Sequence, residues 1–227
     1  MTPIINCMQD MLVGCATVLD VGVGTGRFAL PLSEKGLQIV GVDISAPMMR
    51  QARSKGLRDL VRADARRLPF RDRTFDAVLI VHLLHLVGDW ISVVHEIGRV
   101  SSRVVMTVIS TPWGSPVRQD YLRFREEMGY PLKRLNNAET DLSLLVPPSG
   151  RRHAVDHTST RNAETAISSL ERGDFALSWD LRKDLHSKII ERLRSKYGQN
   201  DYSRKYVYEV STWTPEQLRS FKGPPKP

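Results

Sequence analysis

Residues 18–28 read Val-Leu-Asp-Val-Gly-Val-Gly-Thr-Gly-Arg-Phe, and this stretch decides the fold of the chain. A short apolar run ends at the acid Asp20, glycines follow at positions 22, 24 and 26, and a helical pattern begins after them. Glycine lacks a Cβ and adopts unusual φ/ψ values, so such a loop can bring bare backbone against a ligand. The pattern predicts a strand, a tight glycine loop and a helix, with a ligand at the loop.

The glycine spacing distinguishes two classes of ligand. A dinucleotide fingerprint reads G-x-G-x-x-G, and this chain has Arg27 where the third glycine would stand. The carboxylate of Asp20 would repel a pyrophosphate, whereas it suits a ligand that carries an ammonium group. An NAD-dependent dehydrogenase is therefore the disfavoured reading.

Four later segments strengthen a different interpretation. A second apolar run ends in an acid at Asp43, a third segment contains Asp64, a fourth run is strongly apolar, and a helical pattern precedes a fifth run. These segments are residues 38–45, 61–70, 74–81 and 95–100. Together with the glycine loop, they resemble the motifs of the class I S-adenosylmethionine-dependent methyltransferases, in the order of that family.

The resemblance implies a cofactor site for S-adenosylmethionine, with S-adenosylhomocysteine as the product. A carboxylate at Asp43 can accept both ribose hydroxyls, as the acid after strand two does in Rossmann-like sites. By the resemblance, Asp64 faces the adenine amino group and Asp20 serves the cofactor directly or through water. The predicted cofactor-binding residues are Asp20, Gly22, Gly24, Thr25, Gly26, Asp43, Ile44, Met48, Asp64, Ala65 and Val81.

Several of these residues have a purely structural alternative. The glycines can simply permit a tight turn, and Asp20 can be a buried acid satisfied by the loop amides. Asp64 can pair with Arg62 or Arg66 at the surface. Met48 competes with its neighbour for the adenine face, and a core position explains it nearly as well.

The catalytic candidates are the two histidines that follow the fourth strand, His82 and His85. A histidine titrates near neutral pH and can take a substrate proton. The alternative is that one packs under the loop and the other is solvated. His153 and His157 are too far apart on one strand face for a compact metal site, so no metal is predicted.

The alternation of apolar and helical segments predicts an α/β fold. By the resemblance, this is a doubly wound, mostly parallel, seven-stranded Rossmann-like sheet with an antiparallel last strand and a helical substrate-cover insertion. Strands are expected near 17–21, 38–43, 60–63, 75–81, 104–109, 153–160 and 205–212, and helices near 25–35, 46–55, 89–99, 117–128, 162–172 and 182–197. The motif acids then meet at the carboxyl ends of the strands, where ligands bind.

One methyltransferase domain is expected over residues 1–227. It comprises a cofactor-binding half (1–109), a substrate-cover region with the late strand and helices (110–200), a final strand and end (201–222) and a tail (223–227). Residues 129–150 are expected to be irregular, because proline and glycine interrupt them. Aromatic side chains that suit either a pocket lining or a core are Trp113, Tyr121, Phe124, Tyr130 and Trp179.

The composition of the chain predicts the cellular location of the protein and excludes some classes of partner. No apolar run is long enough for a membrane span, and the N-terminal residues do not read as a signal peptide. Cys7 and Cys15 are the only cysteines of the 227 residues and have no metal or redox spacing, so a reduced, cytoplasmic protein is expected. The net charge of +8 is spread along the chain, and a solvated rim is the expected role of its densest part, 58–73.

The expected function is methyl transfer to a small-molecule acceptor, as in the quinone-biosynthesis-like branch of the family. The apolar segment 78–85 lacks the Asn/Asp-Pro-Pro-aromatic motif of relatives that methylate nucleic-acid amino groups. No cysteine follows Cys15, which removes the covalent route to cytosine C5. The alternatives are an RNA or protein methyltransferase, which the basic charge supports, and a catalytically silent cofactor-binding subunit.

Overall fold

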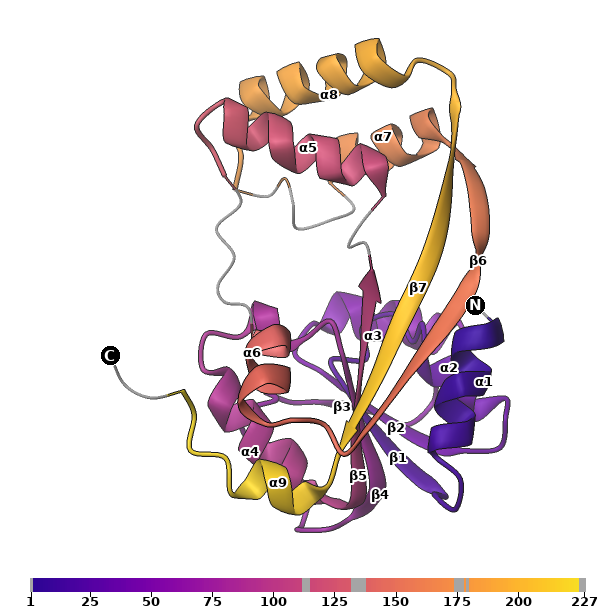
Figure 1. The fold of residues 1–227 in the computed structure, drawn as a ribbon, viewed down its shortest axis with the longest axis vertical. Helices are drawn as coiled ribbons and strands as arrows, with labels where there is room; N and C mark the ends of the chain where they lie inside the picture. The colour runs from indigo at the N-terminus through magenta and orange to yellow at the C-terminus, as the bar shows by residue number, and fades with distance from the viewer. Residues whose placement is uncertain (1, 112–114, 132–137, 174–177, 179, 225–227) are drawn as a thin grey trace. The chain divides into compact units, whose positions relative to one another are not determined.

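The structure is a computed structural model that describes residues 2–111, 115–131, 138–173, 178 and 180–224 (Figure 1). Trp113 and Trp179, two of the aromatic candidates for a pocket lining, lie outside the described residues, as do the last residues of the predicted tail. The side chain of His157 is also outside the described part.

Seven strands of the described chain form one sheet in the order β3-β2-β1-β4-β5-β7-β6 (Figure 1). Their bounds are β1 (Thr17–Val21), β2 (Gln38–Asp43), β3 (Leu60–Arg62), β4 (Phe75–Val81), β5 (Ser101–Thr111), β6 (Gly150–Asn162) and β7 (Asp201–Trp213). Apolar runs form the central strands β1, β2 and β4, because burial on both faces removes the need for polar alternation, whereas β6 and β7 contain many charged and polar residues. The predicted fold class is confirmed.

The first five strands are parallel. β1 pairs with β2 on one side and with β4 on the other, and Asp20 lies opposite Gly41 and Leu79 in these pairings. β3 extends the sheet beyond β2, and β5 extends it beyond β4. The strand order reverses between β1 and β4, so the loops after these two strands flank the switch point at which ligands bind in such sheets.

The last strand runs against its neighbours. The Ser149 amide donates to the Thr212 carbonyl at 2.8 Å, and the Ala163 amide donates to the Asn200 carbonyl at 3.1 Å. Positions rise along β6 as they fall along β7, which is the register of an antiparallel pair. Figure 1 shows β7 running opposite to β5 as well, as expected for the last strand.

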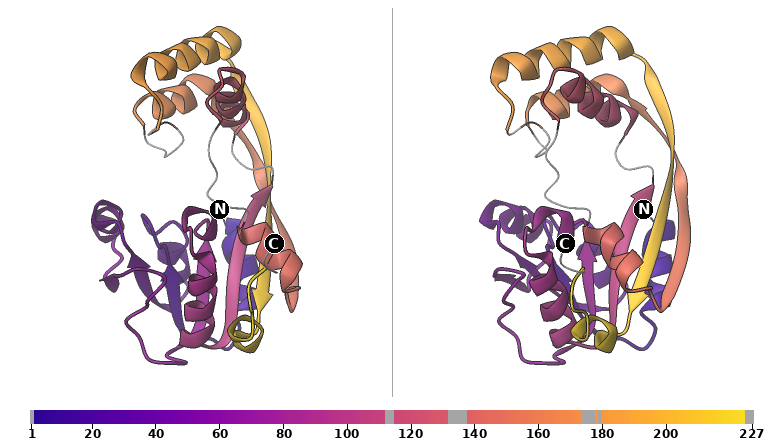
Figure 2. Two further views of the ribbon diagram at one scale, coloured as in Figure 1. Left: turned by 90° about the vertical axis from the view of Figure 1, so that its left-hand side faces the viewer. Right: turned by 60° about the vertical axis from the view of Figure 1, so that its left-hand side comes forward.

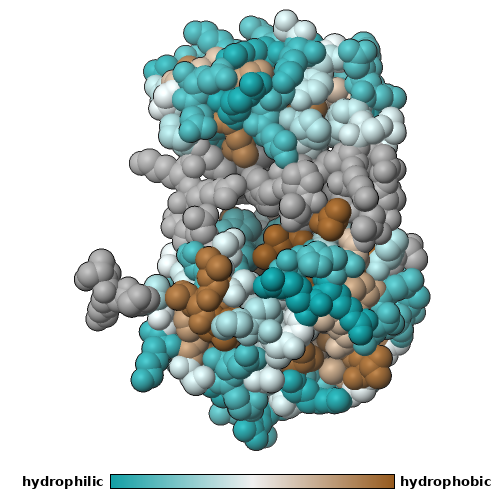
Figure 3. Space-filling view, in the orientation of Figure 1, coloured by the Kyte–Doolittle hydropathy of each residue, from teal (hydrophilic) through white to brown (hydrophobic). Residues whose placement is uncertain are grey.

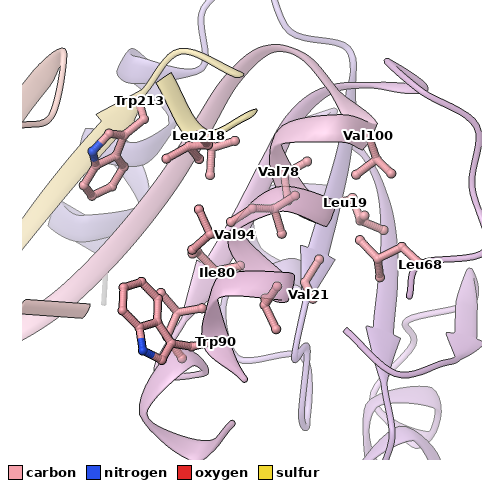
Figure 4. Close-up of a cluster of buried hydrophobic side chains, with 14 of the residues drawn as sticks. Leu19, Val21, Leu68, Val78, Ile80, Trp90, Val94, Val100, Trp213 and Leu218 are labelled. Carbon is pink, nitrogen blue, oxygen red and sulfur yellow. The ribbon is translucent and has the colours of Figure 1, made fainter. Parts of the chain in front are cut away.

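A hydrophobic core fills one face of the sheet under α4 (Trp90–Val100), α6 (Ala138–Leu145) and α9 (Pro215–Arg219) (Figure 4). Leu19 and Val21 of β1 and Ile80 of β4 point into it. Successive side chains of a strand point to opposite faces, so Asp20 faces the other side of the sheet. There α1 (Thr2–Met11) packs against α2 (Ala29–Ser33), and α3 (Ala46–Ser54) packs against β2 and β3.

The chain divides into two compact units. The first consists of residues 1–109, 134–154 and 208–227, and it includes the helices named above and the single-turn helix η1 (Leu84–Leu86). The second consists of residues 110–133 and 155–207. Whether they behave as one methyltransferase domain with a substrate cover stays a prediction.

The described residues of the second unit include three helices around a core of their own (Figures 1 and 2). They are α5 (Pro116–Glu127), α7 (Ala163–Glu171) and α8 (Lys183–Tyr197). Tyr121 and Phe124, which the sequence offers as either pocket or core residues, belong to this core. Figure 3 shows mostly hydrophilic side chains on the visible face of these helices.

Two predicted segments are wrong. The helix expected at 25–35 is only α2 (Ala29–Ser33), because Gly26 has a φ of 77° that no right-handed helix accommodates. The region 129–150, expected to be irregular, contains α6, whose buried Ala138 and Leu142 give it a face for the core. Among the described helices, none is long and apolar enough to cross a membrane.

Candidate cofactor site

The glycine loop after β1 is held in left-handed backbone conformations. Gly22, Gly24 and Gly26 have φ values of 77°, 55° and 77°. A Cβ on Gly22 would lie 2.9 Å from Cδ1 of Leu83, whereas a Cβ on Gly24 would meet only the Gly22 carbonyl oxygen, at 3.9 Å. Gly22 is therefore required by close packing, while Gly24 presents open backbone on which a ligand can lie.

Asp43 fastens this loop to the end of β2. Its Oδ2 accepts a hydrogen bond from the Gly24 amide at 2.8 Å, and its Oδ1 accepts one from the Ser45 amide at 2.8 Å. An ionised carboxylate has about four acceptor positions, so two amides leave capacity for further donors. The half-buried Asp43 thus organises the loop and can still accept ribose hydroxyls.

Asp20 is a buried acid without a protein partner in the described chain. Asp20 is only 3% exposed, and no N–H or O–H group of the described residues donates to its side chain. Burial, and secondly the charge of Asp43, raise the pKa of Asp20 to about 7. The predicted alternative, an acid satisfied by the loop amides, is therefore not what the described residues show. A cationic ligand beside Asp20 would supply the missing partner.

Asp64 is engaged within its own loop. Arg66 donates to it from the backbone amide at 2.9 Å and from Nη2 at 2.6 Å, and these hydrogen bonds hold the pKa of Asp64 below its ordinary value. Arg62 instead donates to the Ile44 carbonyl at 3.1 Å. The surface pairing that the sequence offered is thus present, and a contact of Asp64 with adenine stays a prediction.

A clamp from α4 holds the same loop, and the sequence did not reveal it. Arg99 donates to the carbonyls of Phe70 and Leu68 at 2.8 and 3.1 Å, and Glu96 accepts from the Leu68 amide at 2.6 Å. Glu96 and Arg99 are also hydrogen-bonded to each other. An acid and a base three residues apart are common on helices, so nothing in the pattern singled them out.

The remaining predicted cofactor residues surround the loop ends. Ile44 is 63% exposed, as single apolar side chains at protein surfaces often are. Thr25, Met48 and Val81 are half-buried, and Ala65 lies at the edge of the core. Their contacts with a cofactor stay predictions.

The two histidines after β4 occupy different environments. His82 has a φ of 53°, which is uncommon for a residue other than glycine. Burial, and then the charges of His85 and Arg27, lower the pKa of His82. His85 lies in η1, where its Nδ1 is 2.8 Å from Oε1 of Glu139. The sequence missed Glu139 because it lies in the stretch expected to be irregular.

The strand order, the antiparallel last strand, the glycine loop and the acid after β2 together define a Rossmann-like fold of the methyltransferase type. A model of the methyltransferase domain family matches residues 19–103. This matched stretch contains the glycine loop, Asp43 and Asp64, and it is similar to the cofactor-binding part of class I S-adenosylmethionine-dependent methyltransferases, a family whose cofactor is S-adenosylmethionine.

Curated relatives carry two kinds of name. Demethylmenaquinone methyltransferase of Streptomyces avermitilis is 32% identical over 59% of this chain and 60% of its own length. The enzyme of that name from Roseiflexus castenholzii is 41% identical over 48% of each chain. Phosphatidylethanolamine N-methyltransferase of Cereibacter sphaeroides is 35% identical over 50% of this chain and 62% of its own. The chain thus spans less than two thirds of these relatives.

Solved structures share the fold across most of the chain. A methyltransferase candidate of Anabaena variabilis from an antibiotic biosynthesis pathway has a TM-score of 0.64 and 18% identity, covering 92% of this chain and 96% of its own. The [4+2]-cyclase SpnF has a TM-score of 0.54 and 21% identity over 92% and 80% of the two chains. A fold shared with a cyclase does not by itself decide the reaction.

Proposed function

We propose that this protein transfers the methyl group of S-adenosylmethionine to a small-molecule acceptor. The observation that carries the proposal is Asp20, a buried carboxylate without a protein partner in the described chain, at the head of an open glycine loop. A ligand that carries both an ammonium and a sulfonium group fits this position better than a dinucleotide does.

The chain offers a group for each part of the cofactor. Asp20 would balance the amino end, the open backbone at Gly24 would admit the ligand, and Asp43 would accept the ribose hydroxyls. Asp64 would accept from the adenine amino group beside its pairing with Arg66. The bound cofactor supplies an electrophilic methyl group, and the protein has to orient the acceptor and exclude water, which can contribute about 7–11 kcal/mol.

Two observations support a small acceptor. The segment after β4 is apolar and lacks the motif typical of nucleic-acid amino methylation. The relatives named after demethylmenaquinone and phosphatidylethanolamine bear the names of lipid-like molecules rather than of RNA or protein. That the protein works in the cytoplasm also stays a prediction.

The test is transfer of labelled methyl groups. The full chain is incubated with methyl-labelled S-adenosylmethionine and, in separate reactions, with RNA, protein and small-molecule fractions of a cell extract. Label is expected in the small-molecule fraction, and Asp43→Ala serves as the inactive control. Label that appears chiefly in RNA or protein contradicts the proposal, and cofactor binding without any transfer indicates a silent subunit.

A further inference from the structure

The loop after β4 lies directly beside the glycine loop. Gly22 leaves room for the Leu83 side chain, whose Cδ1 is 2.9 Å from the position of a Gly22 Cβ. β4 is also the neighbour of β1 in the sheet, with Ile80 opposite Val21. The histidines on either side of Leu83 therefore belong to the edge of the sheet that holds the cofactor loop.

One of these histidines is held by a carboxylate from a distant helix. Oε1 of Glu139 lies 2.8 Å from Nδ1 of His85 and also accepts from the His85 backbone amide at 3.3 Å. The Glu139 side chain is only 16% exposed. Burial raises the pKa of Glu139, but the hydrogen bonds and charge of His85 outweigh burial and hold it below its ordinary value.

This geometry fixes the tautomer of the imidazole. At neutral pH the carboxylate of Glu139 is ionised and can only accept, so Nδ1 of His85 carries the proton. Nε2 then keeps its lone pair and can receive a proton. The imidazolium formed would be stabilised by the same carboxylate, which is the arrangement of an oriented general base.

The lone pair on Nε2 of His85 suits one kind of acceptor. A phenolic or enolic hydroxyl is a weak nucleophile until it loses its proton, so a positioned base accelerates its methylation. The free-base form of an amine already has a lone pair and needs no base before it attacks. The charged neighbours are engaged within the protein, because Glu139 is hydrogen-bonded to His85 and Nη2 of Arg27 donates to the Tyr208 hydroxyl at 2.9 Å.

We propose that His85 is the proton acceptor for methyl transfer, that Glu139 is its positioning residue, and that the acceptor carries an acidic phenolic or enolic hydroxyl. The inference rests on the proposed function. The hydroxyl proton moves to Nε2 of His85. The oxygen, or the ring carbon conjugated to it, forms the bond to the methyl carbon, and the carbon–sulfur bond breaks with its electron pair on sulfur. Where the carbon is methylated, its ring hydrogen leaves as a proton and the oxygen takes up a proton, which restores the aromatic ring. The imidazolium then returns its proton to solvent.

The matched variants are Glu139→Gln and Asp141→Asn, which each neutralise one acid in the first turn of α6. The probes are catechol and 1,4-naphthohydroquinone as phenolic acceptors and ethanolamine as the amine. With a phenolic probe at neutral pH, Glu139→Gln is expected to lower kcat/KM by about 100-fold. Asp141→Asn is expected to match the wild type, and both variants should bind S-adenosylhomocysteine like the wild type.

The pH dependence separates a proton-transfer defect from a structural one. The deficit of Glu139→Gln should shrink as pH rises, because more of the phenolic probe is already ionised and needs no base. A deficit that is the same at every pH, or equal losses in Glu139→Gln and Asp141→Asn, overturns the assignment. Transfer to ethanolamine but to neither phenolic probe overturns the acceptor class, and so does cofactor binding without transfer to any of the three.

A second measurement needs no acceptor. Nitrogen-15 spectra of the imidazoles should show His85 protonated at Nδ1 in the wild type and in Asp141→Asn, and without that preference in Glu139→Ala, which has no side-chain acceptor. The same tautomer mixture in all three proteins overturns the positioning role. A wild type that does not bind S-adenosylmethionine, yet shows the expected spectra, would refute the proposed function and leave the His85–Glu139 contact standing.

Discussion

The candidate cofactor site of the first unit and the helices of the second unit both bury an ionisable side chain, but the partners of the two side chains differ. Asp20 is 3% exposed, and no donor of the described chain reaches it. Arg125 is 1% exposed, and it donates from Nη1 and Nη2 to the two carboxylate oxygens of Asp180, each at 2.9 Å. The guanidinium of Arg125 is thus satisfied within the protein, whereas the carboxyl group of Asp20 keeps its acceptor capacity for the predicted cationic ligand.

The polar contacts of the two regions differ in kind as well. At the candidate cofactor site, backbone amides of Gly24 and Ser45 bind the carboxylate of Asp43. In the second unit, long side chains bind one another, as Arg194 does with Glu164 and Glu171. Backbone amides at a glycine loop form a shaped surface for a ligand, while side-chain pairs hold helices together.

The largest effect on cofactor affinity is expected for Asp43→Ala. The change removes the acceptor of the Gly24 and Ser45 amides and of the predicted ribose hydroxyls, each hydrogen bond to a charged group contributing about 1.5–3 kcal/mol. Calorimetry with S-adenosylhomocysteine should show an affinity at least about 100-fold lower. The exposed Asp59 is the control, and Asp59→Ala should stay within about twofold of the wild type. Unchanged affinity in Asp43→Ala would show that the ligand does not bind at Asp43.

Asp20→Asn is expected to lower the affinity for the cofactor and to raise the free energy of unfolding. The folded pKa of Asp20 is about 7, above the ordinary value, so the folded protein binds more protons between about pH 4 and pH 7. The free energy of unfolding of the wild type therefore falls as pH rises through this window. Asn carries no charge, so at pH 8 the variant should gain up to about 4 kcal/mol relative to the wild type.

Urea denaturation at pH 5 and pH 8 checks this expectation. The advantage of Asp20→Asn should be small at pH 5 and large at pH 8. Saturating S-adenosylmethionine should reduce the advantage at pH 8, because the ligand supplies the cation that Asp20 lacks. An advantage that does not depend on pH would show that Asp20 is not the titrating group.

In the second unit, a substitution is expected to change the free energy of unfolding without changing cofactor affinity. Asp180→Ala leaves the buried guanidinium of Arg125 without that carboxylate, and the free energy of unfolding should fall by about 1–3 kcal/mol, since Asp180 is half exposed. Asp184→Ala, which breaks only the surface pair with Arg182, should cost less than about 0.5 kcal/mol. Neither variant should change the affinity for S-adenosylhomocysteine. A loss of affinity would break the distinction between the two regions.

Alanine substitutions at two glycines should have smaller effects, and their comparison distinguishes the cost of close packing from the cost of a left-handed backbone. Gly22 and Gly36 both have positive φ, but only Gly22 has a close neighbour, Leu83. Alanine at Gly36 should cost about 1–2 kcal/mol for the left-handed backbone alone. Alanine at Gly22 should cost about 1 kcal/mol more, because Leu83 must move, and should also weaken cofactor binding. If both substitutions lower the free energy of unfolding equally, the Leu83 side chain can move aside without a cost.

The smallest effect is expected for Thr107→Val on β5. Thr107 is 2% exposed, and its hydroxyl oxygen is shielded from solvent and has no hydrogen-bond partner in the described chain. Valine has nearly the same shape, so the free energy of unfolding should rise by up to about 1 kcal/mol with cofactor affinity unchanged. If affinity falls instead, Thr107 belongs to the binding site and the comparison must include β5.

Prediction from sequence worked best for elements whose bounds depend on a few neighbouring residues. The strands at 17–21, 38–43 and 75–81 have the predicted bounds, because apolar runs with an acid or a glycine at the end are local signals. It failed at 25–35, where the positive φ of Gly26 delays the helix to Ala29. It also failed at α6, where a helix exists because its apolar face has a core to cover.

The sequence by itself determined the order of the strands along the chain, the glycine loop, the acids at the carboxyl ends of β1 and β2 and the acid after β3, since φ preference and hydrophobic periodicity act over a few residues. The tertiary structure alone decided which distant side chains meet. Glu139 reaches His85 across 54 residues, and Arg125 reaches Asp180 across 55. Such pairs have no local signature, because their distance depends on how helices and strands pack. For the same reason, only the fold shows that Asp20 is buried and has no partner in the described chain.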